Sequence, residues 1–96
     1  MSKVEEISMR VGAVVKRRRQ ELGMSQEALA SKCKLHRTYL SDVERGGRNI
    51  SLHTLVRLAE ALDCTTAELI ADAEAAVRHN AASSSPMYAE SGSRTA

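Results

Sequence analysis

The sequence contains few of the residues that build disulfide frameworks or zinc sites, and it has no long apolar run. Its two cysteines, Cys33 and Cys64, form no CxxC pair and have no histidine at ligand spacing, which argues against zinc and for a reducing compartment. Each stands where an apolar residue would serve, so we interpret both as inert core thiols. No apolar run approaches the roughly 18 residues of a membrane span, and no signal peptide is visible. We therefore expect a cytoplasmic protein with no membrane contact.

The pattern of catalytic residues is missing as well. The three histidines, His36, His53 and His79, do not converge with a nucleophile, and the sequence has no phosphate-cradling glycine motif and no metal-ligand spacing. We therefore expect neither an enzyme nor a cofactor or metal site. A chain of 96 residues predicts one small domain with a modest core, which dimerisation would stabilise further.

The net charge of +2 hides an uneven distribution along the chain. Residues 10–48 hold ten Lys or Arg and four acids, a net +6, whereas residues 49–96 hold three Arg and six acids, a net −3. A basic half beside an acidic half indicates a polyanionic partner for the basic half. The run from Lys16 to Arg19 contributes four of these cations; its alternative interpretation is a solvated helix face.

Residues 25–48 are organised as two short helices joined by a tight turn. The apolar positions at helical spacing form one buried seam: Leu29, Ala30, Cys33, Leu35, Leu40 and Val43. The second helix is predicted from Arg37 to Glu44, and the side chains left pointing outward around it are polar: His36, Arg37, Thr38, Ser41 and Asp42. Hydrogen-bonding side chains at the start of a helix are typical of a recognition helix that reads base edges in the DNA major groove.

These strings also carry a resemblance. SQEALA at residues 25–30, HRTYLS at 36–41 and ERG at 44–46 resemble the helix-turn-helix of the phage Cro and repressor (XRE-like) family. The string HRTYLSDVERGGRNISL is similar to the controller proteins of restriction–modification systems. The resemblance spans about residues 11–70 and implies an all-α, five-helix, lambda-repressor-like bundle. It also implies a transcription regulator that binds double-stranded DNA as a homodimer on a pseudo-palindromic operator. In the controller subgroup it would regulate its own promoter and contact RNA polymerase.

The candidate DNA contacts divide into base readout and backbone contact. Arg37 is the first choice for readout, because a guanidinium matches O6 and N7 of guanine with two hydrogen bonds. Asp42 could accept from cytosine N4 or merely orient Arg37, and Tyr39 could pack in the core, place its hydroxyl on a phosphate, or do both. The residues predicted for base readout are Arg37, Thr38, Ser41 and Asp42. Those predicted for the DNA backbone are Arg17, Arg18, Gln26, His36, Tyr39, Arg45, Arg48 and Asn49.

The resemblance implies further roles. It pairs Arg19 with Glu44 as a structural ion pair, and it places Gln26 on a phosphate at the N-terminus of its helix. Two positions depart from the family pattern: Lys34 stands where the family commonly has glycine in a left-handed conformation, and His36 replaces the usual Ser or Thr cap of the recognition helix. A lysine at positive φ costs on the order of 1 kcal/mol.

Three further helices are predicted, over residues 4–22, over 52–62 with a Ser51 cap, and over 65–77, where Thr65 and Glu68 form a capping-box pattern. The last two are expected to pair across a two-fold axis, which the resemblance supports; the alternative is simple core packing. The predicted interface residues are Leu52, Leu55, Leu69, Ile70, Ala73 and Val77. The domain would span residues 1–78, and the small, polar residues 79–96 are predicted to form a disordered tail.

An antitoxin of the same fold, which binds a toxin protein and its own operator, is the alternative function. The sequence has no dedicated toxin-binding extension other than the tail. Co-purification with a partner protein would separate this hypothesis from a free regulator.

Overall fold

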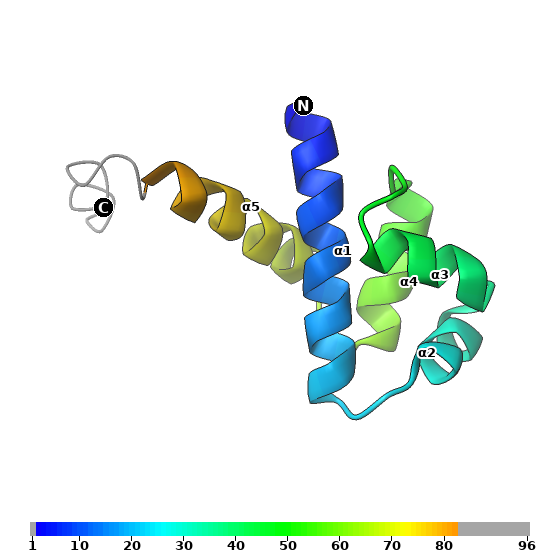
Figure 1. Ribbon diagram of the computed structural model, residues 1–96. Helices are drawn as coiled ribbons and strands as arrows, with labels where there is room; N and C mark the ends of the chain where they lie inside the picture. Colours follow the sequence, from blue (N-terminus) through cyan, green and yellow to red (C-terminus); the bar gives the residue numbers. More distant parts are fainter. Residues whose placement is uncertain (1, 83–96) are drawn as a thin grey trace.

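The computed structural model describes residues 2–82, which form five helices and no strand (Figure 1). In chain order these are α1 (Lys3–Glu21), α2 (Gln26–Cys33), α3 (Arg37–Glu44), α4 (Leu52–Ala61) and α5 (Thr66–Ala82). The predicted all-α bundle is therefore confirmed. Helix α5 runs past the domain boundary predicted after residue 78, and the rest of the predicted tail, residues 83–96, lies outside the described residues.

Side-chain caps determine where most of these helices begin. Ser25 accepts a hydrogen bond from the backbone N–H of Ala28 at 3.0 Å, and Ser51 accepts from that of Thr54 at 3.1 Å. Thr65 and Glu68 bond each other's backbone N–H at 2.9 and 3.0 Å, as the predicted capping box requires. These local bonds satisfy N–H groups that a helix start otherwise leaves unpaired.

The core is built from the apolar faces of all five helices. Its fully buried large side chains are Val15, Leu29, Leu40, Val43, Leu58 and Leu69. Burying one such side chain stabilises the fold by about 1.5–3 kcal/mol. Three residues predicted for the dimer interface belong to this core within a single chain: Leu55 is 8% exposed, and Leu69 and Ala73 are 0% exposed. The alternative interpretation, simple core packing, therefore describes these three residues. Their side chains are already buried within one chain and offer little surface to a partner.

Helix α1 is the central element, with α3 packed on one side and α5 on the other (Figure 1). Its contact with α3 depends on Gly12, which is buried against the backbone of Val43. A Cβ at Gly12 would lie 2.0 Å from the carbonyl oxygen of Val43, so only glycine permits this approach. Gly12 thereby determines how closely α3 rests on the rest of the bundle.

The two cysteines are free thiols. Cys33 is buried, and its Sγ donates to the carbonyl oxygen of Leu29 at 3.0 Å; Cys64 is half-buried. Burial raises the pKa of both thiols above the ordinary value. Among the described residues, no group of His, Cys, Asp or Glu is arranged to hold a metal ion, and no helix is long and apolar enough to cross a membrane.

Candidate nucleic-acid interface

Helix α3 divides cleanly into a buried face and a polar face. Leu40, Val43 and Glu44 are buried, whereas Arg37 and Thr38 are exposed. Ser41 and Asp42 are half-buried and follow Arg37 and Thr38 by four residues each, so the four predicted readout residues form one face of two turns. Arg37 has one weak ionic neighbour, Glu27, with 3.7 Å between Nε and Oε2. Its guanidinium is therefore free to reorient toward a ligand.

The turn between α2 and α3 contains both departures from the family pattern. Lys34 adopts φ 59° and ψ 45°, the left-handed conformation for which glycine is commonly used, and its N–H bonds the carbonyl oxygens of Ala30 and Ser31. His36 occupies the N-cap position of α3, but its side chain makes no capping hydrogen bond. The imidazole of His36 is exposed and has no role in holding the helix start.

A buried ion pair joins α1 to the end of α3. Arg19 donates from Nε to Glu44 Oε2 at 2.7 Å and from a terminal nitrogen to Glu44 Oε1 at 3.1 Å. The hydrogen bond to Glu44 raises the pKa of Arg19. Gln26, predicted to lie on a phosphate, donates its side-chain N–H to the same Glu44 at 3.0 Å. The start of α2, the end of α3 and α1 are thus tied together at one carboxylate, which orients the helix-turn-helix as a rigid unit.

The C-terminal end of α3 carries a second group, which we call the Asp42 cluster: Tyr39, Ser41, Asp42, Arg45 and Arg48. Arg45 bonds both Asp42 and Ser41 Oγ, the latter at 2.7 Å. Arg48 lies 3.4 Å from the second oxygen of Asp42, and its guanidinium carbon is 5.3 Å from the centre of the Tyr39 ring. Asp42 therefore contacts Arg45 and Arg48 and does not orient Arg37.

Arg17 and Arg18 lie away from this surface. Both guanidinium groups reach Asp72 on α5, at 2.9 and 3.0 Å, and α5 packs on the side of α1 opposite to α3 (Figure 1). Hydrogen bonding by Arg18 lowers the pKa of Asp72, and the same bond raises that of Arg18. The two cations predicted for the DNA backbone thus fasten α5 to α1.

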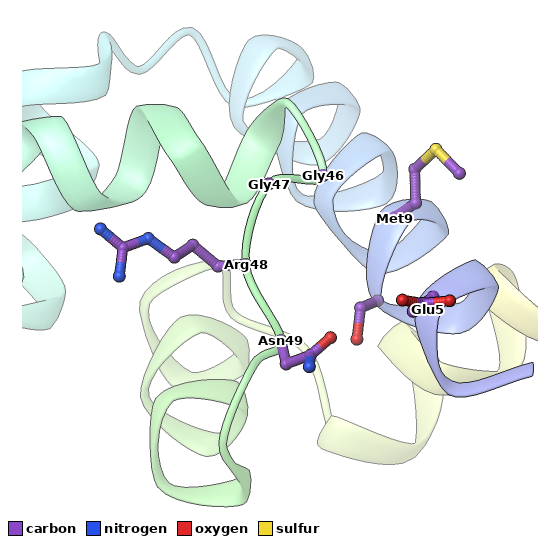
Figure 2. A pocket seen from close by; sticks show the side chains of 7 residues that line it. Glu5, Met9, Gly46, Gly47, Arg48 and Asn49 are labelled. Carbon is purple, nitrogen blue, oxygen red and sulfur yellow. The ribbon is translucent and has the colours of Figure 1, made fainter. Parts of the chain in front are cut away.

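Asn49 is directed differently from its neighbour Arg48, another predicted backbone contact. Figure 2 shows the side chains of Arg48 and Asn49 on opposite sides of the loop after α3, with Asn49 directed toward α1. There it lines a pocket together with Glu5, Ser8 and Met9. Arg48 is directed away from α1.

Three features of the site were not predicted. Gly12 could have been noticed as a glycine inside an apolar helix stripe, a pattern that indicates close backbone approach. The contact of Asp72 with Arg18 could not be predicted, because the residues beside Asp72 in the sequence do not indicate that it meets a basic run 54 residues earlier. The pairing of Asp42 with Arg45 follows helical i, i+3 spacing and was accessible to sequence reasoning.

The family model described as helix-turn-helix (HTH_3) matches residues 15–69, which contain α2, α3, α4 and the last turns of α1. The chain therefore belongs to the HTH_3 helix-turn-helix family, as its resemblance to the Cro and repressor type indicated.

Several individual proteins to which the chain is similar are controller proteins. Control protein C.BamHI of Bacillus amyloliquefaciens is 51% identical over 47 residues, 49% of this chain and 58% of that protein. Control protein C.MunI of a Mycoplasma species is 38% identical over 72 residues, 74% of this chain and 97% of that protein. The solved structure of the restriction–modification controller protein C.Esp1396I tetramer in complex with its natural 35 base-pair operator aligns with a TM-score of 0.63 and 35% identity, covering 76% of this chain and 97% of that chain. These matches confirm the likeness to controller proteins; this chain spans little more than half the length of C.BamHI.

Proposed function

We propose that the chain is a sequence-specific regulator of transcription that binds double-stranded DNA through α3. The observation that carries the proposal is the polar face of α3, exposed at Arg37 and Thr38 and continued by the half-buried Ser41 and Asp42. A frame that Arg19 and Glu44 hold rigid presents this face. Such a face fits the major groove, where Arg37 can bond guanine and Thr38 can contact a thymine methyl group. The relatives that are named as control proteins support this role.

The same proposal includes a homodimer on a pseudo-palindromic operator. A two-fold dimer would hold two α3 helices about 34 Å apart, one turn of DNA. Leu52 and Val56 on α4 are 72% and 38% exposed, an apolar surface that the single chain leaves open. Oligomeric binding by the related C.Esp1396I tetramer on its operator supports this assembly.

Control of the chain's own promoter, with contact to RNA polymerase beside it, is the finer form of the proposal. The likeness to controller proteins supports it. Footprinting the purified chain on its own upstream DNA, with and without RNA polymerase, tests this form: a protected inverted repeat that extends when polymerase is added is the expected result.

Arg37 provides the test of sequence reading. Arg37→Ala should weaken binding to the selected operator by about 5–150-fold, since a bidentate base contact discriminates by ~1–3 kcal/mol, and should weaken binding to random duplex much less. Arg37→Lys keeps the charge but loses the rigid two-pronged geometry, so its operator affinity should fall between those of the wild type and Arg37→Ala, whereas its binding to random DNA should match the wild type. Titrations of both duplexes at fixed salt measure the difference. Equal losses on both duplexes would assign Arg37 to phosphate contact.

A further inference from the structure

The Asp42 cluster places two arginines of the candidate interface against one carboxylate instead of leaving them open to a ligand. Arg45 bonds one oxygen of Asp42 and Arg48 lies against the other. The arginine side chains are 68% and 52% exposed, whereas the carboxylate is 25% exposed. The side chain of Asp42 is therefore less exposed than either arginine, and the two guanidinium groups lie over it at the surface.

Each arginine also has a second partner. Arg45 donates to Ser41 Oγ at 2.7 Å, and Arg48 lies over the ring of Tyr39. Charge-assisted hydrogen bonds and cation–π contacts of this kind each contribute stabilisation at a partly exposed site. Both guanidinium groups are thus held at the end of α3 by Asp42 and its neighbours.

Asp42 lies on the face that would meet DNA. It follows Thr38 by four residues on the polar face of α3, one turn beyond the predicted base contacts. A carboxylate there repels phosphates, and it neutralises part of the charge that Arg45 and Arg48 would otherwise bring to them.

We propose that Asp42 determines specificity by withholding Arg45 and Arg48 from DNA that lacks the operator sequence. This inference rests on the proposed function. Non-specific binding comes almost entirely from phosphate neutralisation, so it loses most when two cations are engaged elsewhere. On the operator, base contacts from Arg37 and Thr38 hold the helix close to the DNA and help to offset the work of separating the arginines from Asp42; on random DNA the phosphate contacts alone must offset it. A repulsive element of this kind discriminates by weakening the wrong complex.

The test compares Asp42→Asn with a matched control, Asp63→Asn. Asp63 lies between α4 and α5 at φ 59°, a conformation that asparagine also tolerates, so both variants remove one negative charge by the same chemical change. The operator is first selected from a random duplex pool with the wild-type chain. Dissociation constants of all three proteins for the operator and for a scrambled duplex are then measured across a salt series.

Asp42→Asn should bind the scrambled duplex about tenfold more tightly than the wild type, with a salt slope steeper by about 0.9–1.8, as one or two added phosphate contacts require. Its operator affinity should stay within about threefold of the wild type, so the ratio of operator to scrambled affinity falls. A larger loss on the operator would assign Asp42 to base readout and overturn the proposal. Asp63→Asn should change both affinities equally and only slightly.

A second background isolates the arginines. In the double variant Arg45→Gln, Arg48→Gln, the effect of Asp42→Asn on scrambled DNA should shrink to the smaller effect of removing the carboxylate's own repulsion of phosphates, because no withheld cation remains. An undiminished effect would reduce Asp42 to a simple charge and overturn the proposal, as would equal gains on operator and scrambled DNA. A wild-type chain that selects no sequence would contradict the proposed function instead; the salt slopes on scrambled DNA would still show whether Asp42 withholds the arginines.

Discussion

Single residues at the junction of α1 and α3 decide whether the recognition face is presented at all. Gly12 lets the backbones touch, and Arg19 reaches across to Glu44 beside that contact. A close backbone approach excludes even a methyl group, and a buried carboxylate requires its cation. The position of α3 therefore depends on residues that make no contact with DNA in the proposed complex.

Gly12→Ala tests this close approach. Alanine favours a helix interior by up to about 1 kcal/mol over glycine, but its Cβ would lie 2.0 Å from the Val43 carbonyl oxygen, and overpacking of that kind costs about 1–3 kcal/mol or more. The obstacle is backbone and cannot rotate away, so the cost should lie at or above the top of this range. We therefore expect a net loss of about 2 kcal/mol in the free energy of unfolding, measured by urea denaturation.

Gly47→Ala is the matched control for this substitution. A Cβ there would meet its nearest atom, the carbonyl oxygen of Asp42, at an ordinary 3.5 Å. Its free energy of unfolding should change by less than about 0.5 kcal/mol, as at an unconstrained surface site. If Gly12→Ala were as stable as Gly47→Ala, α1 and α3 would have room for a methyl group between them, and the close approach of Gly12 to Val43 would be contradicted.

At the scale of the elements, α5 is attached to α1 by apolar packing and by one charged contact. Leu69 and Ala73 enter the core, and Asp72 between them receives both Arg17 and Arg18. Neighbouring residues of the basic run at the end of α1 thus bind different helices. Arg17 and Arg18 hold α5, and Arg19 holds α3.

Asp72→Asn should remove a pH-dependent part of the stability. The pKa of Asp72 is lowered from 3.8 by its arginine partners, so the ionised carboxylate favours the folded chain. This contribution is complete above the unfolded pKa and is lost as pH falls through the lower folded pKa. Because the side chain is 35% exposed, solvent screening limits the contribution to roughly 1 kcal/mol or less.

Thermal unfolding of the wild type and of Asp72→Asn from pH 7 to pH 2 measures this contribution. The gap in melting temperature should be largest at neutral pH and should close below pH 3.8, the ordinary value for the group. Glu74→Gln, an equal loss of charge on the same helix, provides the comparison. A gap that persisted unchanged at pH 2 would mean that Asp72 acts by packing and not by charge.

The whole molecule combines a basic segment, residues 10–48, with an acidic one, residues 49–96. The described part of the first segment contains the recognition helix, and that of the second contains α4 and α5. With Leu55, Leu69 and Ala73 inside the single chain, the apolar side chains that α4 and α5 still offer to the proposed dimer are Leu52, Val56 and the half-buried Ile70. The side chain of Val77 lies outside the described residues.

Leu52→Asp is expected to weaken the proposed dimer. Burying a leucine in an interface stabilises it by about 1.5–3 kcal/mol, so the dimer dissociation constant should rise by at least tenfold, which corresponds to about 1.4 kcal/mol. Sedimentation across a concentration series measures the constant. Leu22→Asp, at a leucine that is 52% exposed beyond the end of α1, should leave it unchanged. If the dissociation constant were unchanged by Leu52→Asp but raised by Leu22→Asp, the dimer interface would lie near the end of α1 and not on α4.

Much of the recognition unit could be predicted from the sequence, because its signals act over three or four residues. The bounds of α3, the caps at Ser25 and Ser51 and the capping box at Thr65 follow from helical spacing and from side chains that reach the nearest backbone N–H groups. The Arg19–Glu44 pair, 25 residues apart, came from the family resemblance and is present in the structure.

Only the tertiary structure decided which way the basic run and the apolar stripes of α4 and α5 face. Arg17 and Arg18 meet Asp72 because α5 crosses α1 at one particular place. Leu69 and Ala73 on α5, and Leu55 on α4, are buried within one chain because α5 packs against both α1 and α4. Local periodicity identifies the apolar side of a helix, but not the element that covers it. That choice depends on the packing of all five helices together, in which a single close contact, Gly12 on Val43, determines how near α3 lies to α1.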